Sequence, residues 1–345
     1  MKKRIPRTGR YRTGVIALRF GGTHLSAYME SPHFEVVGIC DIDERLLAEK
    51  AGLCGARVVT TDYRELLASP EIDVVSVTTP DFLHREMTEA ALKAGKHVIV
   101  EKPLALTLPD CKAIVRAARN SSAQCMVGQV CRFAPGFVMA KGLIDKGIIG
   151  ELFFVESEYA HDYAEVVGWN NWRKSREIGR DGVIGGGCHA VDLLRWIGGD
   201  VAEVTAYANH KMLTDWSQPD TTVACLKFRG KGLIGKVFVS IAVKRPYTMR
   251  SCFYGSEGSI VCDNTSPSLK LYTTKFPAMS DFVDVPVGNQ SKNIPGEIEY
   301  FYEVLSGKRD HVLTALEGAR TAATCLAIVK SARRGGMPTK VPDVD

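Results

Sequence analysis

Two stretches of the sequence place ionisable side chains where they could do chemistry. Glu101 and Lys102 directly follow a short apolar run, and His189 comes soon after three consecutive glycines. Ammonium and imidazole groups can take part in acid–base chemistry when a fold holds them beside a substrate. The elements that hold Lys102 and His189 therefore decide whether either residue is functional.

Lys102 is predicted to lie at the ligand-binding edge of a parallel sheet. Val98–Val100 form a short apolar run between Gly95 and Pro103, which is typical of a buried parallel strand. Ligands of open α/β sheets bind at the carboxyl ends of the strands, which is where Glu101 and Lys102 stand. Two interpretations remain open: a functional lysine, or a solvated Lys–Glu pair at a strand end.

His189 is predicted to lie near the start of a helix with an apolar face. His189 and Asp192 are three residues apart and therefore share another face of that helix. Each glycine in a helix costs about 1 kcal/mol relative to alanine. The run Gly185–Gly187 therefore indicates that a substrate, a nicotinamide ring or another helix packs closely against this backbone. The alternative is a buried histidine that only contributes to the core.

The start of the chain has the order of a dinucleotide-binding unit. We expect a strand over residues 14–18, a turn over 19–24 and a helix to about Ser31, followed by a strand over 34–40 that ends at Asp41. A carboxylate at Asp41 would bind the hydroxyls of the adenosine ribose and repel a 2′-phosphate. The sequence therefore favours NAD over NADP.

The glycines of the dinucleotide fingerprint are incomplete. Aligned to G-x-G-x-x-G, the turn reads Ala17-x-Arg19-x-x-Gly22, so only the third glycine is present. Arg19 could offer charge to the pyrophosphate in place of a close backbone approach. Alternatively, Gly21 and Gly22 could provide that approach two residues later. A doubly wound domain that binds no nucleotide is the third interpretation.

The pattern of elements predicts two domains of different architecture. Strands and helices alternate up to about residue 128, which predicts a parallel, doubly wound α/β sheet. Long alternating strands after residue 150 predict an α+β domain with a large, mostly antiparallel open sheet, closed by helices over 296–306 and 314–333. We expect a basic tail over 1–13, a dinucleotide-binding domain over 14–129, and a substrate-binding and oligomerisation domain over 130–345.

Composition is that of an ordinary globular protein. The 345 residues carry a formal net charge of +5 and 45% hydrophobic residues, which fits two domains and gives no sign of nucleic-acid binding. The apolar runs are too short to predict a membrane span. Ten cysteines without a CxxC pair or a Cys/His ladder predict free thiols, a cytoplasmic location and no metal site.

Taken together, the motifs resemble the Gfo/Idh/MocA oxidoreductases, the family of glucose–fructose oxidoreductase and inositol dehydrogenase. The likeness covers nearly the whole chain from Gly14 onward. It rests on the segments Gly14–Ile16, Cys40–Asp41, Thr79–His84, Ala94–Val98, Glu101–Ala105, Arg132–Phe133, Gly147–Glu151 and Gly187–Leu194.

The resemblance implies an N-terminal Rossmann domain and hydride transfer between NAD(P) and a hydroxyl or ketone of a sugar, cyclitol or glycoside. It implies that Lys102 binds and polarises the reacting hydroxyl, that His189 exchanges its proton, and that a cis peptide bond precedes Pro103. We expect the cofactor to contact Ala17, Arg19, Phe20, Gly21, Gly22, Asp41, Thr79, Pro80, His84, Glu101 and Lys102. We expect the substrate to contact Lys102, Arg132, Tyr159, His161, Trp172, Arg173, Cys188 and His189.

One departure from the family lies four residues before His189, where many members carry an aspartate and this chain has Gly185. Three alternatives follow. His189 works as the base with Lys102 alone, another side chain assists His189, or the site is enlarged for a bulkier glycoside. The side chains that could assist are Asp192, His161 and Tyr159. Two rival functions stay open: redox-neutral glycoside cleavage through a transient keto sugar, and a sugar- or nucleotide-sensing regulator without catalysis. In each case we expect a homodimer or higher homo-oligomer that associates through the C-terminal sheet.

Overall fold

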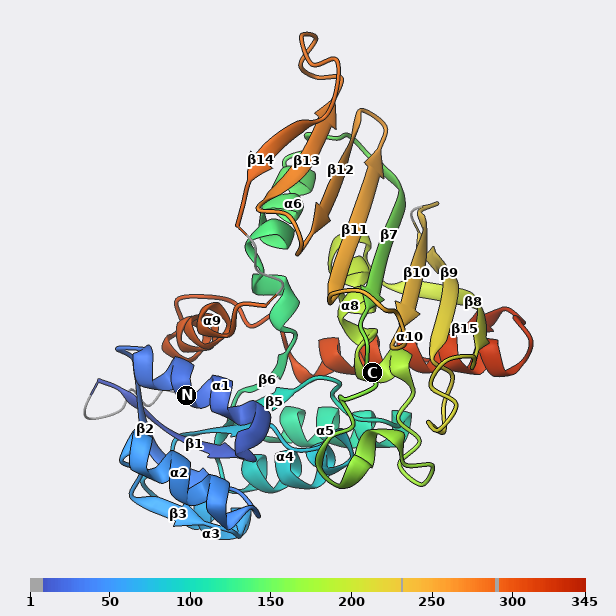
Figure 1. The fold of residues 1–345 in the computed structure, drawn as a ribbon. Coiled ribbons are helices and arrows are strands. Elements are labelled where there is room, and N and C mark those ends of the chain that lie inside the picture. Colours follow the sequence, from blue (N-terminus) through green and yellow to red (C-terminus); the bar gives the residue numbers. More distant parts are fainter. Residues whose placement is uncertain (1–8, 231, 289–291) are drawn as a thin grey trace. The chain divides into compact units, whose positions relative to one another are not determined.

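The computed structural model describes residues 9–230, 232–288 and 292–345, which pack into two compact units (Figure 1). The first unit holds the chain up to Gln129, Ile294–Ala319 and the last two residues. The second unit holds Val130–Asn293 and Arg320–Asp343. No helix among the described residues is both long and apolar enough to cross a membrane.

The first unit is a doubly wound sheet in which every strand pair is parallel, with the strand order β3-β2-β1-β4-β5-β6. Its strands are β1 (Tyr11–Ile16), β2 (Phe34–Cys40), β3 (Val58–Thr60), β4 (Val74–Val77), β5 (His97–Glu101) and β6 (Cys125–Gly128). Its helices are α1 (Leu18–Glu30), α2 (Glu44–Cys54), α3 (Tyr63–Ala68), the 3-10 helix η1 (Asp81–Leu83), α4 (His84–Lys93), α5 (Leu108–Asn120) and α9 (Ile294–Ser306). The predicted Rossmann architecture is confirmed. The strand order reverses between β1 and β4, and ligands of such sheets bind outside the carboxyl ends of the strands at that point.

The first strand and the first helix both begin earlier than the sequence predicts. β1 starts at Tyr11, inside the predicted tail, because Arg12 forms an ion pair with Asp73 (2.9 Å) and Thr13 is buried between β2 and β4. Helix α1 starts at Leu18, so the predicted turn over residues 19–24 is helical. Residues 1–8 of the predicted tail lie outside the described residues.

Helix α9 packs against α1 in the first unit, although it lies late in the chain. Its buried side chains include Ile298, Phe301 and Val304. The segment after α9 lies beside β6, where the backbone N–H of Val127 donates to Leu313 O (3.0 Å). From the sequence we assigned all residues after 130 to the second domain. The apolar face of a helix does not tell which of two cores it covers, so the pattern could not assign α9.

The second unit is built on a nine-stranded sheet of order β14-β13-β12-β11-β7-β10-β9-β8-β15. β10 and β7 pair in parallel, and the other recorded neighbours are antiparallel, which confirms the predicted mostly antiparallel sheet. The strands are β7 (Leu152–Ala160), β8 (Val201–Asn209), β9 (Thr221–Phe228), β10 (Ile234–Ser240), β11 (Thr248–Gly255), β12 (Gly258–Asp263), β13 (Ser268–Thr273), β14 (Val283–Pro286) and β15 (Thr339–Lys340). The helices are the 3-10 helix η2 (Val130–Phe133), α6 (Pro135–Asp145), the 3-10 helix η3 (Trp169–Lys174), α7 (Gly182–Gly185), α8 (Cys188–Gly198) and α10 (Ala315–Arg333), of which the part from Arg320 onward belongs to this unit.

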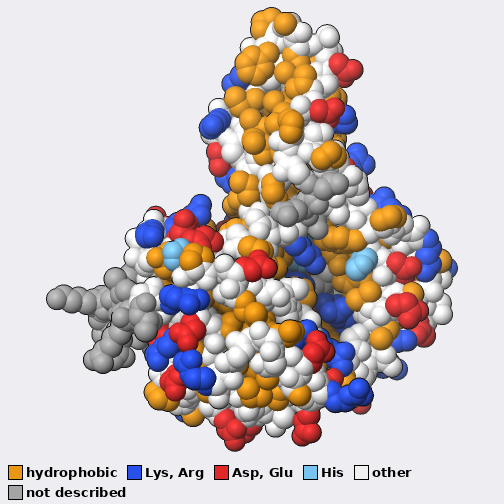
Figure 2. Space-filling model, turned by 60° about the vertical axis from the view of Figure 1, so that its left-hand side comes forward, with side chains coloured by type: hydrophobic (Ala, Val, Ile, Leu, Met, Phe, Trp, Pro, Cys, Tyr) orange, Lys and Arg blue, Asp and Glu red, His pale blue; other side chains and the backbone are white. Residues whose placement is uncertain are grey.

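One face of this sheet is covered and the other is exposed. Helix α8 packs on β7 and β10, and Ser331 of α10 accepts a hydrogen bond from the backbone N–H of Ala206 in β8. On the opposite face, Tyr207, Val223 and Ile234 are 63%, 40% and 53% exposed. Hydrophobic side chains also gather on the surface over β13, β14 and α6 (Figure 2). The second unit therefore presents apolar surface that its own helices do not cover.

Candidate active site

The carboxyl end of β1 turns into α1 at Ala17, which has a positive φ of 71°. Neighbouring strands fix this conformation. Ala17 N donates to Cys40 O (2.8 Å), and the Thr78 hydroxyl lies 2.7 Å from the carbonyl oxygens of both Ile16 and Ala17. Glycine adopts a positive φ freely, whereas alanine does so at a cost of about 1 kcal/mol or more. The turn thus keeps the backbone that the first glycine of the fingerprint usually provides, although the glycine itself is missing.

Gly21, rather than Gly22, is the glycine at which α1 packs closely on the sheet. A Cβ at Gly21 would lie 2.4 Å from Thr78 Oγ1 and 2.8 Å from Val15 Cγ1. A Cβ at Gly22 would meet Lys50 Cε at 3.9 Å, an ordinary contact distance. In the fingerprint, the third glycine allows the helix to pack closely on the strand. The close-packing glycine is therefore Gly21, and not Gly22, to which the alignment gave this role.

Asp41 ends β2 beside the first turn of α1. Its Oδ2 accepts from Leu18 N (2.6 Å), its Oδ1 accepts from Asp43 N (2.9 Å), and the side chain is buried. Arg19 forms a partly exposed ion pair with Asp43 (3.0 Å). An acidic side chain at this strand end is the group that binds the ribose in dinucleotide-binding folds. The turn at Ala17, the packing of α1 and the position of Asp41 together fit a dinucleotide.

The loops that follow β4 and β5 are tied together by His84. Its Nδ1 lies 2.8 Å from Pro103 O, and its Nε2 lies 3.1 Å from Thr79 O. The peptide bond between Lys102 and Pro103 is cis, as the resemblance implied. His84 is fully buried, so it braces the two loops, and Pro80 leads from Thr79 into η1.

Lys102 directly follows β5, and its backbone N–H donates to Glu101 Oε2 (3.2 Å). Glu101 is buried, and its Oε1 lies 3.2 Å from His24 Nε2 in α1. The ring of Phe20, which is 37% exposed, lies edge-on to His24 at 6.0 Å. Sequence reasoning missed His24. The signal was its place three residues after Gly21, which puts it one turn further along the helix face that packs on the sheet.

His189 lies in the first turn of α8 and is 1% exposed. Its ring stacks on Tyr159 of β7, with centroids 6.2 Å apart. A Cβ at Gly186 would lie 2.4 Å from Tyr159 Cε1, and a Cβ at Gly187 would lie 2.5 Å from Val239 Cγ2 of β10. The glycines correctly predicted that other atoms pack closely against this backbone. Those atoms belong to the side chains of Tyr159 and Val239 in the sheet.

Arg180 fills the space beside Gly185. A Cβ at Gly185 would lie 2.0 Å from Arg180 Nη1 and 2.1 Å from Arg180 Cζ. The Arg180 side chain is 3% exposed, and its guanidinium lies 5.2 Å from the centroid of the Trp172 ring. Of the three alternatives for Gly185, an enlarged site is not supported, because the cationic side chain of Arg180 occupies the space. Sequence reasoning missed Arg180, although an arginine just before a glycine-rich helix start was a signal.

Tyr159 and His161 form an aromatic cluster with Tyr163 and Tyr247. The Tyr159 and Tyr163 hydroxyls are 2.7 Å apart, and the His161 ring lies 5.0 Å from that of Tyr163 and 5.1 Å from that of Tyr247. Burial, and then the neighbouring tyrosines, raise the pKa of Tyr159 well above its usual range. Burial, and then the charge of Lys292, lower the pKa of His161. At neutral pH both side chains are thus uncharged and able to form hydrogen bonds.

Trp172 is packed by charged side chains of its own segment. The Arg173 guanidinium lies 5.4 Å from the centroid of the Trp172 ring and 5.9 Å from that of Tyr163. A Cβ at Gly168 would lie 2.4 Å from Trp172 Nε1. By contrast, Trp169 is 43% exposed. These contacts favour a packing role for Trp172 and leave its contact with substrate a prediction.

Arg132 and Asp192 form a buried bidentate ion pair within the second unit. The Nε–Oδ2 and Nη2–Oδ1 distances are both 2.7 Å, and the side chains are 6% and 2% exposed. The Thr321 hydroxyl of α10 also donates to Asp192 Oδ1 (2.9 Å). Both oxygens of Asp192 are thus engaged, so the suggestion that it assists His189 is not supported. The buried Cys188, which precedes His189, directs its thiol to Gly185 O (3.7 Å).

Comparison with known proteins agrees with both units. Residues 11–129 match the model of an oxidoreductase family with an NAD-binding Rossmann fold, and residues 137–261 match the GFO/IDH/MocA C-terminal domain. The chain belongs to the Gfo/Idh/MocA oxidoreductase family. Membership confirms the predicted family, and the NAD-binding fold matches the cofactor expected from the sequence.

Several relatives from the Gfo/Idh/MocA family are named as enzymes that act on sugars. Levoglucosan dehydrogenase of Pseudarthrobacter phenanthrenivorans is 34% identical over 170 residues, which is 49% of this chain but only 44% of that protein. The 1,5-anhydro-D-fructose reductase of Ensifer adhaerens is 27% identical over 87% of this chain and 90% of its own length. A solved structure of levoglucosan dehydrogenase with NADH and levoglucosan has a TM-score of 0.87 at 25% identity, and the match covers 97% of this chain and all of that one.

The predicted site residues divide between the two units. Every residue expected to contact the cofactor lies in the first unit, together with Lys102. The expected substrate residues other than Lys102 lie in the second unit, as do Tyr163, Arg180 and Tyr247, which the sequence reasoning did not single out.

Proposed function

We propose that the protein catalyses NAD-dependent hydride transfer between the nicotinamide and a secondary hydroxyl or ketone of a sugar, cyclitol or glycoside. The observation that carries the proposal is the position of Lys102 at the carboxyl edge of an NAD-binding Rossmann sheet, in a family with sugar dehydrogenases among its named members. When bound, NAD+ accepts the hydride.

Each of the two candidate catalytic groups has a separate task. The ammonium of Lys102 binds the reacting hydroxyl and stabilises the negative charge that develops on its oxygen. The imidazole of His189 takes the hydroxyl proton during oxidation and returns it during reduction. Tyr159, stacked on His189 and held protonated by burial, keeps that ring oriented. Asp192 is left out of this scheme because Arg132 and Thr321 hold its carboxylate.

The preference for NAD over NADP rests on Asp41. Its carboxylate stands at the end of β2 and is buried against the first amide of α1. A 2′-phosphate at the adenosine ribose would meet this negative charge, whereas two ribose hydroxyls could donate to it. NAD is therefore the expected cofactor.

A screen of sugars, cyclitols and glycosides for NADH formation tests cofactor and substrate class together. Levoglucosan and 1,5-anhydro sugars belong in the screen because relatives are named for them. Lys102→Ala and His189→Ala should each lower turnover on the order of 10²-fold or more, whereas Lys93→Ala, on the exposed end of α4, serves as the matched lysine control. Near-wild-type rates in both variants would refute the assignment. Substrate consumption without net NADH would favour the redox-neutral reaction.

We also propose that the exposed face of the nine-stranded sheet associates with a second copy of the chain. Tyr207, Val223 and Ile234 supply apolar surface there, and closed homo-oligomers are the commonest assemblies of soluble proteins. Light scattering coupled to size-exclusion chromatography should give at least twice the 37.8 kDa mass of one chain. Val223→Glu should shift the protein towards the monomer, and a monomeric wild type would refute the proposal.

A further inference from the structure

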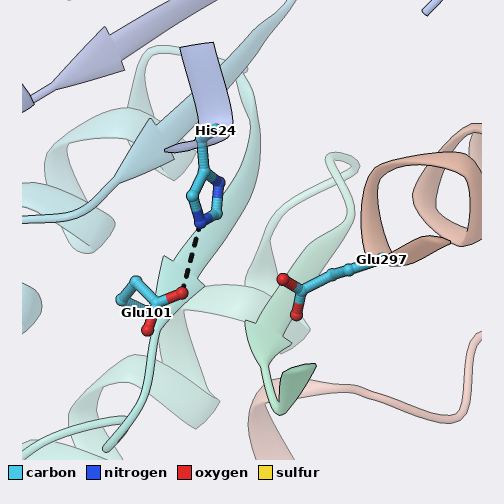
Figure 3. A group of neighbouring side chains, drawn as sticks. All are labelled: His24, Glu101 and Glu297. Atoms are coloured by element: carbon cyan, nitrogen blue, oxygen red, sulfur yellow. Dashed lines mark hydrogen bonds and ion pairs between the residues drawn. The ribbon is translucent and has the colours of Figure 1, made fainter. Parts of the chain in front are cut away.

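Three ionisable side chains meet in the interior of the first unit (Figure 3). His24 comes from α1, Glu101 from the end of β5 and Glu297 from the first turn of α9. One polar atom from each lies within 4.8 Å of the others, and the residues are 0%, 5% and 0% exposed. Two carboxyl groups therefore share a site from which water is nearly excluded.

The His24 side of the cluster is fully hydrogen-bonded. The Tyr28 hydroxyl lies 2.8 Å from Ser76 Oγ, which lies 3.2 Å from His24 Nδ1, and His24 Nε2 lies 3.2 Å from Glu101 Oε1. With Glu101 ionised and His24 neutral, these hydrogen bonds have one consistent direction. Tyr28 donates to Ser76, Ser76 donates to Nδ1, and the Nε2–H of a neutral His24 donates to Glu101.

Glu101 has a second hydrogen-bond donor, whereas no donor to Glu297 is found in the part of the chain that the structure describes. The backbone N–H of Lys102 donates to Glu101 Oε2 (3.2 Å), so each oxygen of Glu101 accepts a hydrogen bond. Among the described residues, neither oxygen of the buried Glu297 has a hydrogen-bond partner. Burial, and then the charge of Glu101, raise the pKa of Glu297 well above its usual range. Hydrogen bonds to a carboxylate favour its charged form, and burial without them favours the neutral one.

We propose that Glu101 and Glu297 carry one proton between them, held on Glu297, and that Glu297 is thereby a positioning residue for Lys102. A neutral Glu297 lets Glu101 keep its charge and accept from both His24 and the Lys102 backbone. If Glu297 were ionised instead, its negative charge would favour protonation of Glu101. A protonated Glu101 is a weaker acceptor for the backbone N–H of Lys102. The catalytic role of Lys102 rests on the proposed function, whereas the proton count does not.

Among the described residues, the titratable groups recorded beside Glu297 are Glu101 on β5 and, on α1, His24 and Tyr28. Burial raises the pKa of Tyr28, so this phenol stays neutral in the pH range of the test. A divalent cation on His24, Glu101 and Glu297 is the competing occupant of the same donor set. The 3.2 Å contact between His24 and Glu101 is a hydrogen-bond distance, which favours the proton.

The first test compares the pH dependence of unfolding in the full-length wild type and Glu297→Gln, whose amide mimics the neutral acid. The folded wild type retains a proton that the unfolded chain loses above about pH 4.5. Between that pH and the folded pKa, the unfolding constant of the wild type should rise relative to that of Glu297→Gln by about tenfold per pH unit. Glu299→Gln, at a half-exposed position of the same helix, should follow the wild type. A ratio that stays constant from about pH 5 to about pH 9 would overturn the proposal.

The second test separates the proton from a metal and from catalysis. After dialysis against zinc or manganese, the wild type and Glu297→Gln should contain the same amount of bound metal. One equivalent of metal in the wild type that is missing from Glu297→Gln would overturn the proposal in favour of a cation site. Glu297→Gln should retain kcat, and Glu297→Ala should lose it. Equal loss in both would refute the positioning role. A wild type inactive on every sugar would contradict the proposed function and leave the stability result standing.

Discussion

The buried ion pair between Arg132 and Asp192 gives a sharp test of how the second unit is held together. Arg132→Ala removes two charge-assisted hydrogen bonds of 2.7 Å and leaves the Asp192 carboxylate, at 2% exposure, with Thr321 as its remaining recorded partner in this network. Each such bond contributes about 1.5–3 kcal/mol, and breaking a buried pair from one side typically costs about 3–5 kcal/mol. We therefore expect Arg132→Ala to lower the unfolding free energy by about 3–5 kcal/mol.

The chain provides a local probe for this measurement. All four tryptophans, Trp169, Trp172, Trp196 and Trp216, lie in the second unit, and Arg132 itself lies 5.8 Å from the Trp196 ring. Urea unfolding followed by tryptophan fluorescence therefore reports on the unit that contains the pair.

Two variants calibrate the result. Thr321→Val removes one hydrogen bond to the same carboxylate and one that Thr321 accepts from Arg195 Nη1 (2.9 Å), and should cost about 1–3 kcal/mol. The double variant Arg132→Met/Asp192→Leu replaces the pair by apolar side chains and should be more stable than Arg132→Ala. A loss below about 1 kcal/mol for Arg132→Ala, with a raised KM, would refute the structural role. Arg132 would then face the substrate, as the sequence first suggested.

Three further predictions concern the first unit. Ala17→Gly should stabilise it by about 1 kcal/mol, because glycine adopts the φ of 71° without strain; thermal unfolding followed by circular dichroism measures this. Gly21→Ala should cost about 1–3 kcal/mol and weaken NAD binding measured by calorimetry, because its Cβ would lie 2.4 Å from Thr78 Oγ1. Burial lowers the pKa of His97, so the folded state stays neutral where the unfolded state takes up a proton below about pH 6.5. Stability should therefore fall as pH drops through about 6.5 towards the folded pKa, and His97→Gln should lack this component.

The fold was predictable from the sequence because its periodicities are strong. Buried parallel strands such as β5 read as short apolar runs, and the half-exposed strands of the second sheet alternate in polarity, as in β9. Once the strands are predicted, their carboxyl ends are predicted too, and so is the sheet edge at which Lys102 lies. The position of α9 was not predictable, because its apolar face fits either core and its partner α1 lies far away in sequence.

Details of the candidate site depended on contacts that no local pattern encodes. The missing first glycine of the fingerprint looked like a lost turn, yet Thr78 and Cys40 hold Ala17 in the same kind of backbone. Gly185 looked like a vacancy, yet Arg180 fills it. Asp192 looked like a partner for His189 on the same helix face, but an arginine sixty residues earlier in the chain binds it instead. Each error came from inferring a neighbour from spacing along the chain.

The most direct test of the central claim follows the hydride itself. A substrate found in the NADH screen, deuterated at its reacting carbon, is oxidised with NAD+, and the nicotinamide is analysed by mass spectrometry and NMR. The account predicts deuterium at C4 of NADH, formed on the order of 10²-fold more slowly by Lys102→Ala and His189→Ala. Conversion of the substrate with no deuterium in NADH would contradict it, as would an NAD+ affinity weaker than millimolar.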